Sequence, residues 1–120
     1  MYRILFVDDS ETQRLSLRMS LSLRGFEVIL AEDGQEAWGI FQTKEFNAVL
    51  TDYDMPHMDG LELIQRIRKS GSKVPIILYC ATWGLEIPAG IVHLSKNDPR
   101  TLSFDFVAQQ LRNVIEPGGS

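Results

Sequence analysis

The 120-residue sequence contains a single cysteine, Cys80, and only two histidines. One cysteine excludes an internal disulfide and any metal cage built from cysteines. No apolar run approaches the roughly 20 residues that a membrane-spanning helix needs. The amino terminus also lacks the length and the cleavage site of a secretion signal. These absences predict a cytoplasmic protein with no membrane-bound segment.

Positive charge is also scarce. Twelve basic residues stand against sixteen acidic ones, which gives a net charge of −4. Because a phosphate backbone requires a basic surface, we expect no direct contact with nucleic acid. Hydrophobic residues make up 44% of the chain and charged residues 23%, which is typical of a globular protein. We expect one folded domain over residues 1–116, followed over 117–120 by a flexible tail or by the boundary to a further domain.

Short apolar runs alternate with amphipathic stretches along the chain. The runs predict strands and the stretches predict helices. On the first predicted helix, Leu15, Met19 and Leu23 recur at four-residue spacing, and we expect them to form its buried face together with Leu17 and Leu21. Strands are predicted over 4–7, 26–31, 48–50, 74–79 and 91–94, and helices over 15–23, 37–41, 61–67 and 102–115.

Continuous apolar strands separated by helices indicate a parallel sheet that is covered on both faces. We therefore expect an α/β fold: a doubly wound, flavodoxin-like sheet of five parallel strands in the order 2-1-3-4-5. The link over 82–90 contains Gly84, Pro88 and Gly90, which are helix breakers. The fourth helix of such a fold is therefore predicted to be shortened or missing.

Polar residues follow the predicted strands at their carboxyl ends. Asp8 and Asp9 follow the first strand, Asp52 closes the third, and Lys96 follows the fifth. Strands 1 and 3 are neighbours in the expected order, so the three carboxylates should meet in one crevice, where they would repel one another. A hard cation such as Mg²⁺ resolves this repulsion. Carboxylates, Mg²⁺ and one lysine suit phosphoryl transfer, with an aspartate as the covalent nucleophile.

These residues resemble the receiver domain of two-component response regulators, over about residues 2–115. The phosphoacceptor aspartate of that family corresponds to Asp52, which is followed four residues later by Pro56 and eight later by Gly60. This spacing is specific when it is combined with Asp-Asp after the first strand and Lys after the fifth. The matching stretches are 4–10, 31–37 and 48–60.

The resemblance implies a role for each matching residue. Asp52 would be phosphorylated, Asp9 would ligate Mg²⁺ directly, and Asp8 would do so directly or through water. The backbone carbonyl of Asp54 would be a further ligand, and Lys96 would pair with a phosphoryl oxygen.

The resemblance also implies partners. The phosphoryl donor would be a phosphohistidine on a histidine kinase or a histidine phosphotransfer protein, and the domain would catalyse its own phosphorylation and dephosphorylation. Pro56 and Gly60 would shape the loop after the third strand. An output domain or a target protein would read the switch, and a homodimer is one form in which it could do so.

The sequence departs from the family pattern near the fourth and fifth strands. The switch position that normally carries Thr or Ser is taken by Cys80 on register, with Thr82 as the alternative. His93 stands where a switch aromatic is expected, and Trp83 lies in the short link, where it could close over the site or cap the core. A thiol donates a weaker hydrogen bond to phosphate than a hydroxyl does.

Two other functions are consistent with parts of the pattern. A pseudo-receiver that binds partners without phosphorylation fits the missing hydroxyl at position 80, although such a protein need not keep the acidic set and the lysine. A small phosphohydrolase of the haloacid-dehalogenase type fits the Asp-x-Asp pair formed by Asp52 and Asp54. That motif normally opens the chain and is accompanied by a cap domain, which makes this third function the weakest.

Overall fold

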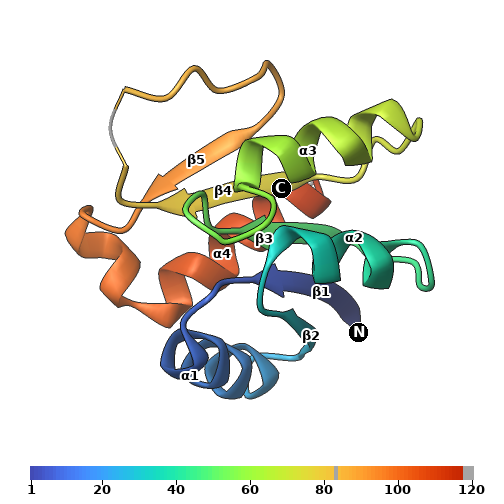
Figure 1. Cartoon of the computed structure of the whole chain (residues 1–120). Helices are drawn as coiled ribbons and strands as arrows, with labels where there is room; N and C mark the ends of the chain where they lie inside the picture. The colour runs from blue at the N-terminus through green and yellow to red at the C-terminus, as the bar shows by residue number, and fades with distance from the viewer. Residues whose placement is uncertain (83, 118–120) are drawn as a thin grey trace.

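The computed structural model describes residues 1–82 and 84–117. It contains five parallel strands, four α-helices and one short 3₁₀ helix (Figure 1). The elements are β1 (Tyr2–Val7), α1 (Glu11–Ser22), β2 (Phe26–Ala31), α2 (Gly34–Phe41), β3 (Ala48–Thr51), α3 (Gly60–Lys69), β4 (Ile76–Cys80), β5 (Val92–Ser95), η1 (Pro99–Leu102) and α4 (Phe104–Ile115).

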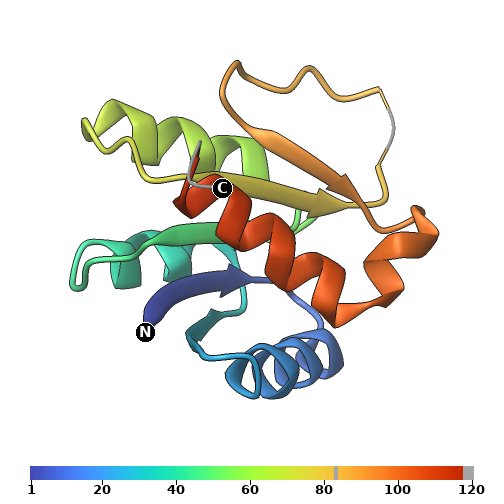
Figure 2. The same ribbon diagram turned by 180° about the vertical axis from the view of Figure 1, so that it is seen from behind.

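The strand order is β2-β1-β3-β4-β5, and every neighbouring pair is parallel. Helices α1 and α4 cover one face of the sheet, while α2 and α3 cover the other (Figures 1 and 2). The predicted doubly wound α/β fold is confirmed. The chain reverses its winding direction between β1 and β3, which is where such sheets bind ligands.

Two apolar clusters hold the layers together, one on each face. Because successive side chains of a strand point to opposite faces, Ile4 and Phe6 of β1 belong to the cluster under α1 and α4. Leu5 and Val7 belong to the cluster under α2 and α3. All four side chains are fully buried. The central strands are therefore rigidly fixed, and the residues that directly follow them inherit that fixed position.

Each of the four α-helices starts from a capping side chain, Ser103 in the case of α4. The side chain of Ser10 accepts a hydrogen bond from the backbone N–H of Gln13, that of Asp33 from Glu36, and that of Asp59 from Glu62. Asp59 was not among the residues singled out from the sequence. Because Ser10 caps α1, the two aspartates before it are not needed as caps and remain available for other chemistry.

The prediction for the buried face of α1 is half wrong. Leu17 and Leu21 are buried against the sheet as expected, but Leu15, Met19 and Leu23 are exposed, with 69% of Met19 and 81% of Leu23 accessible to solvent. Leucines lie on both sides of this helix, and the side with Leu17 and Leu21 is the one that reaches the sheet. The other three form an apolar stripe on the surface.

The segment between β4 and β5 contains no helix in the residues that are described, 81–82 and 84–91, as the sequence predicted. Leu85, Ile87 and Ile91 pack on the cluster beside α2 and α3, so this loop covers the part of the sheet that a helix would otherwise cover. The last predicted helix is divided in two. Ser103 ends η1 and caps α4, and its extended backbone separates the two elements.

None of the helices in the described part of the chain combines the length and apolar character that crossing a membrane requires. The predictions for Trp83 and for most of the tail, residues 118–120, fall outside the described residues. The domain limits at 1–116 stay a prediction.

Candidate functional site

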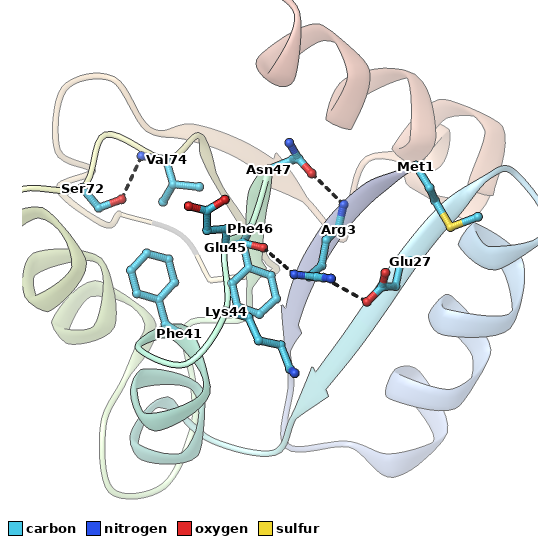
Figure 3. Close-up of a pocket in the computed structure, with 10 residues that line it drawn as sticks. All are labelled: Met1, Arg3, Glu27, Phe41, Lys44, Glu45, Phe46, Asn47, Ser72 and Val74. Carbon is cyan, nitrogen blue, oxygen red and sulfur yellow. Dashed lines mark hydrogen bonds and ion pairs between the residues drawn. The ribbon is translucent and has the colours of Figure 1, made fainter.

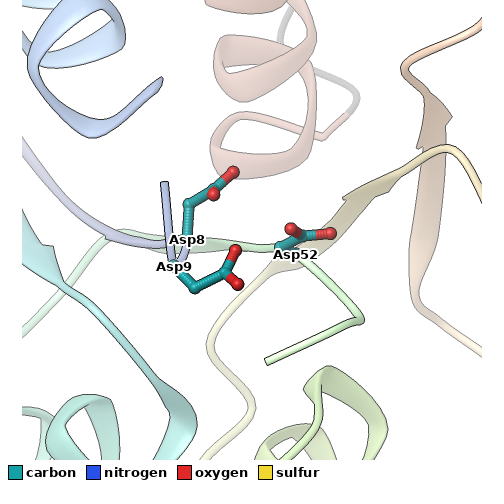
Figure 4. A group of neighbouring side chains, drawn as sticks. All are labelled: Asp8, Asp9 and Asp52. Atoms are coloured by element: carbon teal, nitrogen blue, oxygen red, sulfur yellow. The ribbon is translucent and has the colours of Figure 1, made fainter. Parts of the chain in front are cut away.

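Three aspartates converge at the carboxyl edge of the sheet (Figure 4). One carboxylate oxygen from each of Asp8, Asp9 and Asp52 lies within 4.8 Å of the corresponding oxygens of the other two. Asp8 is buried, with 1% of its surface accessible, while Asp9 is open to solvent. The cluster therefore has a closed inner side and an accessible outer side, as a site that exchanges a ligand with solvent requires.

Backbone hydrogen bonds fix this convergence. The N–H of Asp52 donates to the carbonyl of Val7 (2.8 Å), and that of Asp8 donates to Ala31 (3.1 Å). These bonds extend the parallel ladders of β3 and β1 by one residue each. The carboxylates of Asp8 and Asp52 therefore leave neighbouring strands at the same level of the sheet. This is why the predicted strand order was enough to place them close together.

Each buried carboxylate is also hydrogen-bonded. Asp8 accepts from the backbone N–H of Ser10 (2.9 Å), and Asp52 accepts from that of Tyr53 (2.7 Å). The ammonium group of Lys96 donates to Asp8 Oδ2 (3.0 Å) and lies 3.5 Å from Asp52 Oδ2. The sequence prediction that these residues lie together is confirmed, and the lysine is bound more closely to Asp8 than to Asp52.

Burial and neighbouring charges shift the pKa values of Asp52 and Lys96. Burial, together with the negative charges of Asp8 and Asp9, raises the pKa of Asp52, against the opposing effects of Lys96 and the Tyr53 N–H. Burial alone would lower the pKa of Lys96, but its hydrogen bond to Asp8 and the charge of Asp52 raise it. The lysine is therefore a permanent cation, and the phosphoacceptor candidate is a carboxylate in need of more positive charge.

The residues fit a divalent cation. Three carboxylates and one ammonium group leave a net charge of −2, which one divalent ion neutralises. Two unit charges 4.8 Å apart repel by about 3–4 kcal/mol at an effective dielectric constant near 20, so neutralisation is strongly favoured. Oxygen donors alone, with no histidine or cysteine among them, suit Mg²⁺ better than a softer metal.

The two candidates for the switch position occupy different places. Cys80 is the last residue of β4, pairs in register with Ser95, and is 1% exposed. Its thiol lies 3.6 Å from His93 Nε2, and burial raises the pKa of that thiol. Thr82 stands beyond the strand, and its hydroxyl donates to Asp54 Oδ2 (3.5 Å). Neither of these side-chain contacts involves Asp52, so the choice between Cys80 and Thr82 for the switch position stays a prediction.

The loop after β3 is closely packed at its end. Gly60 is buried, and its N–H donates to the carbonyl of Tyr53 (2.9 Å). A Cβ atom at Gly60 would collide with the backbone carbonyl oxygen of Asp52 and would come within 3.0 Å of Tyr53 Cα. Pro56 is exposed and accepts a hydrogen bond from Met58 N–H (2.8 Å). The glycine is needed because α3 starts directly against the backbone of Asp52.

Asp54 does not join the carboxylate cluster through its side chain. Its carboxylate is exposed and accepts from Thr82 instead. The Asp-x-Asp reading of Asp52 and Asp54 as one catalytic pair therefore finds no support in the geometry. The predicted role of the Asp54 backbone carbonyl as a metal ligand stays a prediction.

Two contacts of the site were not predicted from the sequence. The guanidinium group of Arg14 donates to the backbone carbonyl of Asp8 (2.7 Å), and the ring of Tyr79 lies beneath Lys96, with 5.1 Å between the ring centroid and Nζ. Arg14 lies one turn into α1, and its short separation from Asp8 along the chain could have been used to predict this contact. Tyr79 is the residue before Cys80 and resembles any other apolar strand residue.

A cavity of about 540 Å³ lies elsewhere, at the amino-terminal ends of the strands (Figure 3). Arg3, in its wall, binds Glu27 (2.9 Å) and donates to the carbonyl of Glu45 (3.1 Å). Among the described residues, the group of acidic side chains that could hold a cation lies instead at the carboxyl edge.

Carboxylates and a lysine at the switch point of this fold define a receiver-type signalling domain of two-component systems. Consistent with this, a family model for the response regulator receiver domain matches residues 4–95, which run from within β1 to the end of β5. The chain belongs to the response regulator receiver domain family. Its role is one of signalling rather than metabolism.

Individual response regulators and solved structures are also similar to this chain. Response regulator MprA of Mycolicibacterium vanbaalenii is 44% identical over 79 residues, which cover 66% of this chain and 34% of that relative. The match thus spans about a third of the curated relative's length. The structure of response regulator TrrA of Thermotoga maritima, in complex with Mg²⁺-BeF, has a TM-score of 0.75 and 31% identity, covering 92% of this chain and 99% of that one. Chemotaxis protein CheY4 of Vibrio cholerae has a TM-score of 0.81 and 26% identity, covering 95% and 98%.

Proposed function

We propose that this domain accepts a phosphoryl group on Asp52 in a Mg²⁺-dependent reaction and catalyses its later removal. The observation that carries the proposal is the convergence of Asp8, Asp9 and Asp52 on one point, with the ammonium group of Lys96 between two of them. A pseudo-receiver has no need for this charge arrangement, which is unfavourable without a ligand.

The transfer can be written with named atoms. The free carboxylate oxygen of Asp52 forms a bond to phosphorus while the phosphorus–nitrogen bond of phosphohistidine breaks and its electron pair returns to the imidazole. The other oxygen, Oδ1, is held by the Tyr53 N–H, which orients Oδ2 toward Lys96. The lysine then lies where negative charge grows on the phosphoryl oxygens, and it stabilises that charge.

Asp8, Asp9 and Asp52 would hold Mg²⁺, which supplies charge neutralisation for the incoming phosphoryl group. The protein's own part is to keep the carboxylates fixed. Asp8 is held by Ser10 N–H and Lys96 and its backbone by Arg14, so its position costs little further reorganisation when a ligand arrives. Hydrolysis of the aspartyl phosphate requires water, which can reach the site on the exposed side of Asp9.

The direct experiment adds Mg²⁺ and acetyl phosphate to the full chain and measures intact mass. We expect one phosphoryl group on the wild type and on Asp54→Ala, a matched control that removes an exposed carboxylate two residues away. Asp52→Ala should take none, and EDTA should abolish the reaction. A folded wild type that stays unmodified, and that also shows no beryllofluoride binding with Mg²⁺, would contradict the proposal and favour the pseudo-receiver.

For the partner, we propose that a histidine-bearing helix of a kinase or phosphotransfer protein docks along α1. The stripe of Leu15, Met19 and Leu23 has the four-residue spacing of one helix ridge, and such ridges pack against helices. Helix α1 starts at Glu11, directly after the acidic cluster, and the exposed Leu102 of η1 lies across a groove from it. A helix lying there reaches the phosphoacceptor.

A charge placed on this stripe tests the docking. In Met19→Glu, transfer from a histidine kinase that phosphorylates the wild type should slow at least tenfold, because an ionised carboxylate would face an apolar partner. Phosphorylation by acetyl phosphate should be unchanged. Gln109→Glu puts the same charge on an exposed position of α4 and serves as the control. Equal kinase rates in all three proteins would refute this docking surface.

The cytoplasm is the expected location, because phosphohistidine donors of this family act there. An output domain or a target protein would respond to the phosphorylation of Asp52. The match covers 34% of MprA, so that relative is long enough to contain a further domain. The phosphorylated domain would act either as a homodimer or by binding a separate target protein.

A further inference from the structure

Lys96 must hold one position although it emerges from a short strand. Its backbone N–H donates to the carbonyl of Cys80 (3.1 Å), which fixes its main chain against the end of β4. The side chain beyond that point is long and flexible. Its ammonium group contacts Asp8 and Asp52 on one side, and the ring of Tyr79 on another.

Tyr79 is suited to this contact. It lies on β4 opposite Leu94, and its ring is almost fully buried in the cluster under α1 and α4. Lys96 Nζ stands 5.1 Å from the ring centroid, within the range in which an aromatic face attracts a cation. Burial raises the pKa of the Tyr79 phenol, which keeps the ring neutral beside the carboxylates.

We propose that Tyr79 is a positioning residue whose aromatic face holds the Lys96 ammonium group where a phosphoryl oxygen on Asp52 must be neutralised. The inference rests on the proposed function. Without the ring, the ammonium group would have two carboxylates on one side and an apolar wall or water on the other. It would then follow Asp8, its closer partner, or turn into the groove between α1 and η1, which Tyr79 also lines.

The Tyr79 ring should affect the binding of a phosphoryl group and not the binding of the metal. Among the described residues, Tyr79 makes no hydrogen bond or ion pair with the carboxylates that would hold Mg²⁺, so metal affinity should be insensitive to the ring. A phosphoryl group or beryllofluoride on Asp52 needs Lys96 in place, so its affinity should depend on the ring. This separation distinguishes positioning from general damage to the fold.

The test compares Tyr79→Phe, which keeps the ring, with Tyr79→Leu, which removes it. Beryllofluoride titrations at saturating Mg²⁺, followed by ¹⁹F NMR, should give wild-type affinity within about twofold for Phe. For Leu, affinity should be about five- to tenfold weaker, or about 1–1.4 kcal/mol. Mg²⁺ affinity should agree within about twofold in all three proteins.

A double-mutant cycle with Lys96→Ala completes the test. If the ring acts through the lysine, Tyr79→Leu should have no further effect on beryllofluoride affinity in the Lys96→Ala background. An equal loss in both backgrounds, or wild-type affinity in Tyr79→Leu, would overturn the inference. Should Tyr79→Leu fail to fold, phenylalanines with increasing fluorine content at position 79 keep the shape and weaken the ring's attraction stepwise. An affinity independent of fluorine content would likewise overturn the inference.

The two proposals fail in different ways. Absence of beryllofluoride binding by the wild type refutes phosphoacceptance itself. Normal binding by the wild type and by every Tyr79 variant refutes only the positioning role.

Discussion

Replacing Gly60 with alanine tests whether Asp52, the proposed phosphoacceptor, is held in place by the loop that follows it. The new Cβ would overlap the carbonyl oxygen of Asp52 and approach Asp52 C to 3.1 Å and Tyr53 Cα to 3.0 Å. All three are backbone atoms, so no side chain can rotate away. Since carbon–oxygen contacts normally begin near 3.3 Å, either Asp52 or the start of α3 must move by about 1 Å.

The displacement has two consequences of calculable size. Overpacking a closely packed site costs about 1–3 kcal/mol, and the better helix propensity of alanine returns at most about 1 kcal/mol, so Gly60→Ala should lose about 1–2 kcal/mol of unfolding free energy. A 1 Å misplacement of a reacting group can also reduce the rate by up to about 100-fold. We expect phosphorylation by acetyl phosphate to slow by about 10- to 100-fold.

Urea unfolding followed by circular dichroism, together with intact-mass kinetics, measures both effects. Gly39→Ala is the matched control, because Gly39 is exposed within α2 and a Cβ there meets nothing within 4 Å. That variant should gain about 0.5–1 kcal/mol and react at the normal rate. If Gly60→Ala is as stable and as reactive as Gly39→Ala, the close approach of α3 to Asp52 does not constrain the site.

Three further results are expected. Because the pKa of Asp52 is raised in the folded state, the folded state still holds a proton at pH values where the unfolded chain has lost it, so the unfolding free energy falls as pH rises from the unfolded-state pKa through the folded-state pKa. In EDTA, Asp52→Asn should therefore have a higher Tm than wild type at pH 7, with the gain shrinking toward pH 4; an undiminished gain at pH 4 would argue against this cause. Cys80→Thr should bind beryllofluoride about three- to tenfold more tightly with Mg²⁺, since a hydroxyl is the better donor; unchanged affinity would place position 80 away from the phosphoryl group. The buried Cys80 thiol should react with Ellman's reagent only slowly until urea unfolds the domain, and rapid reaction in native buffer would contradict its burial.

The sheet and its order were predictable because each strand is a continuous apolar run bounded by polar residues. A strand buried on both faces leaves few alternatives for a run such as Ile4–Val7 or Ala48–Leu50. The convergence of Asp8 and Asp52 then followed from topology, since parallel neighbours end at the same edge. The predicted topology and the family resemblance therefore identified the same aspartates and the same lysine.

The orientation of α1 was not predictable at the same level. Apolar residues occupy both the side with Leu17 and Leu21 and the side with Leu15 and Met19, so periodicity permits either side to face the sheet. Only tertiary packing decides between them. The contact between Tyr79 and Lys96 was missed for a similar reason, because it joins β4 to the residue after β5 through side-chain directions that spacing along the chain does not reveal.

The ion pair between Lys96 and Asp8 has a consequence for how the protein is made. A buried carboxylate without a partner would cost several kcal/mol, which can prevent a small domain from folding. Here Lys96 and the Ser10 N–H already satisfy Asp8. Because the lysine already neutralises Asp8, a newly made chain can reach its final shape without waiting for a cation to bind at this edge of the sheet.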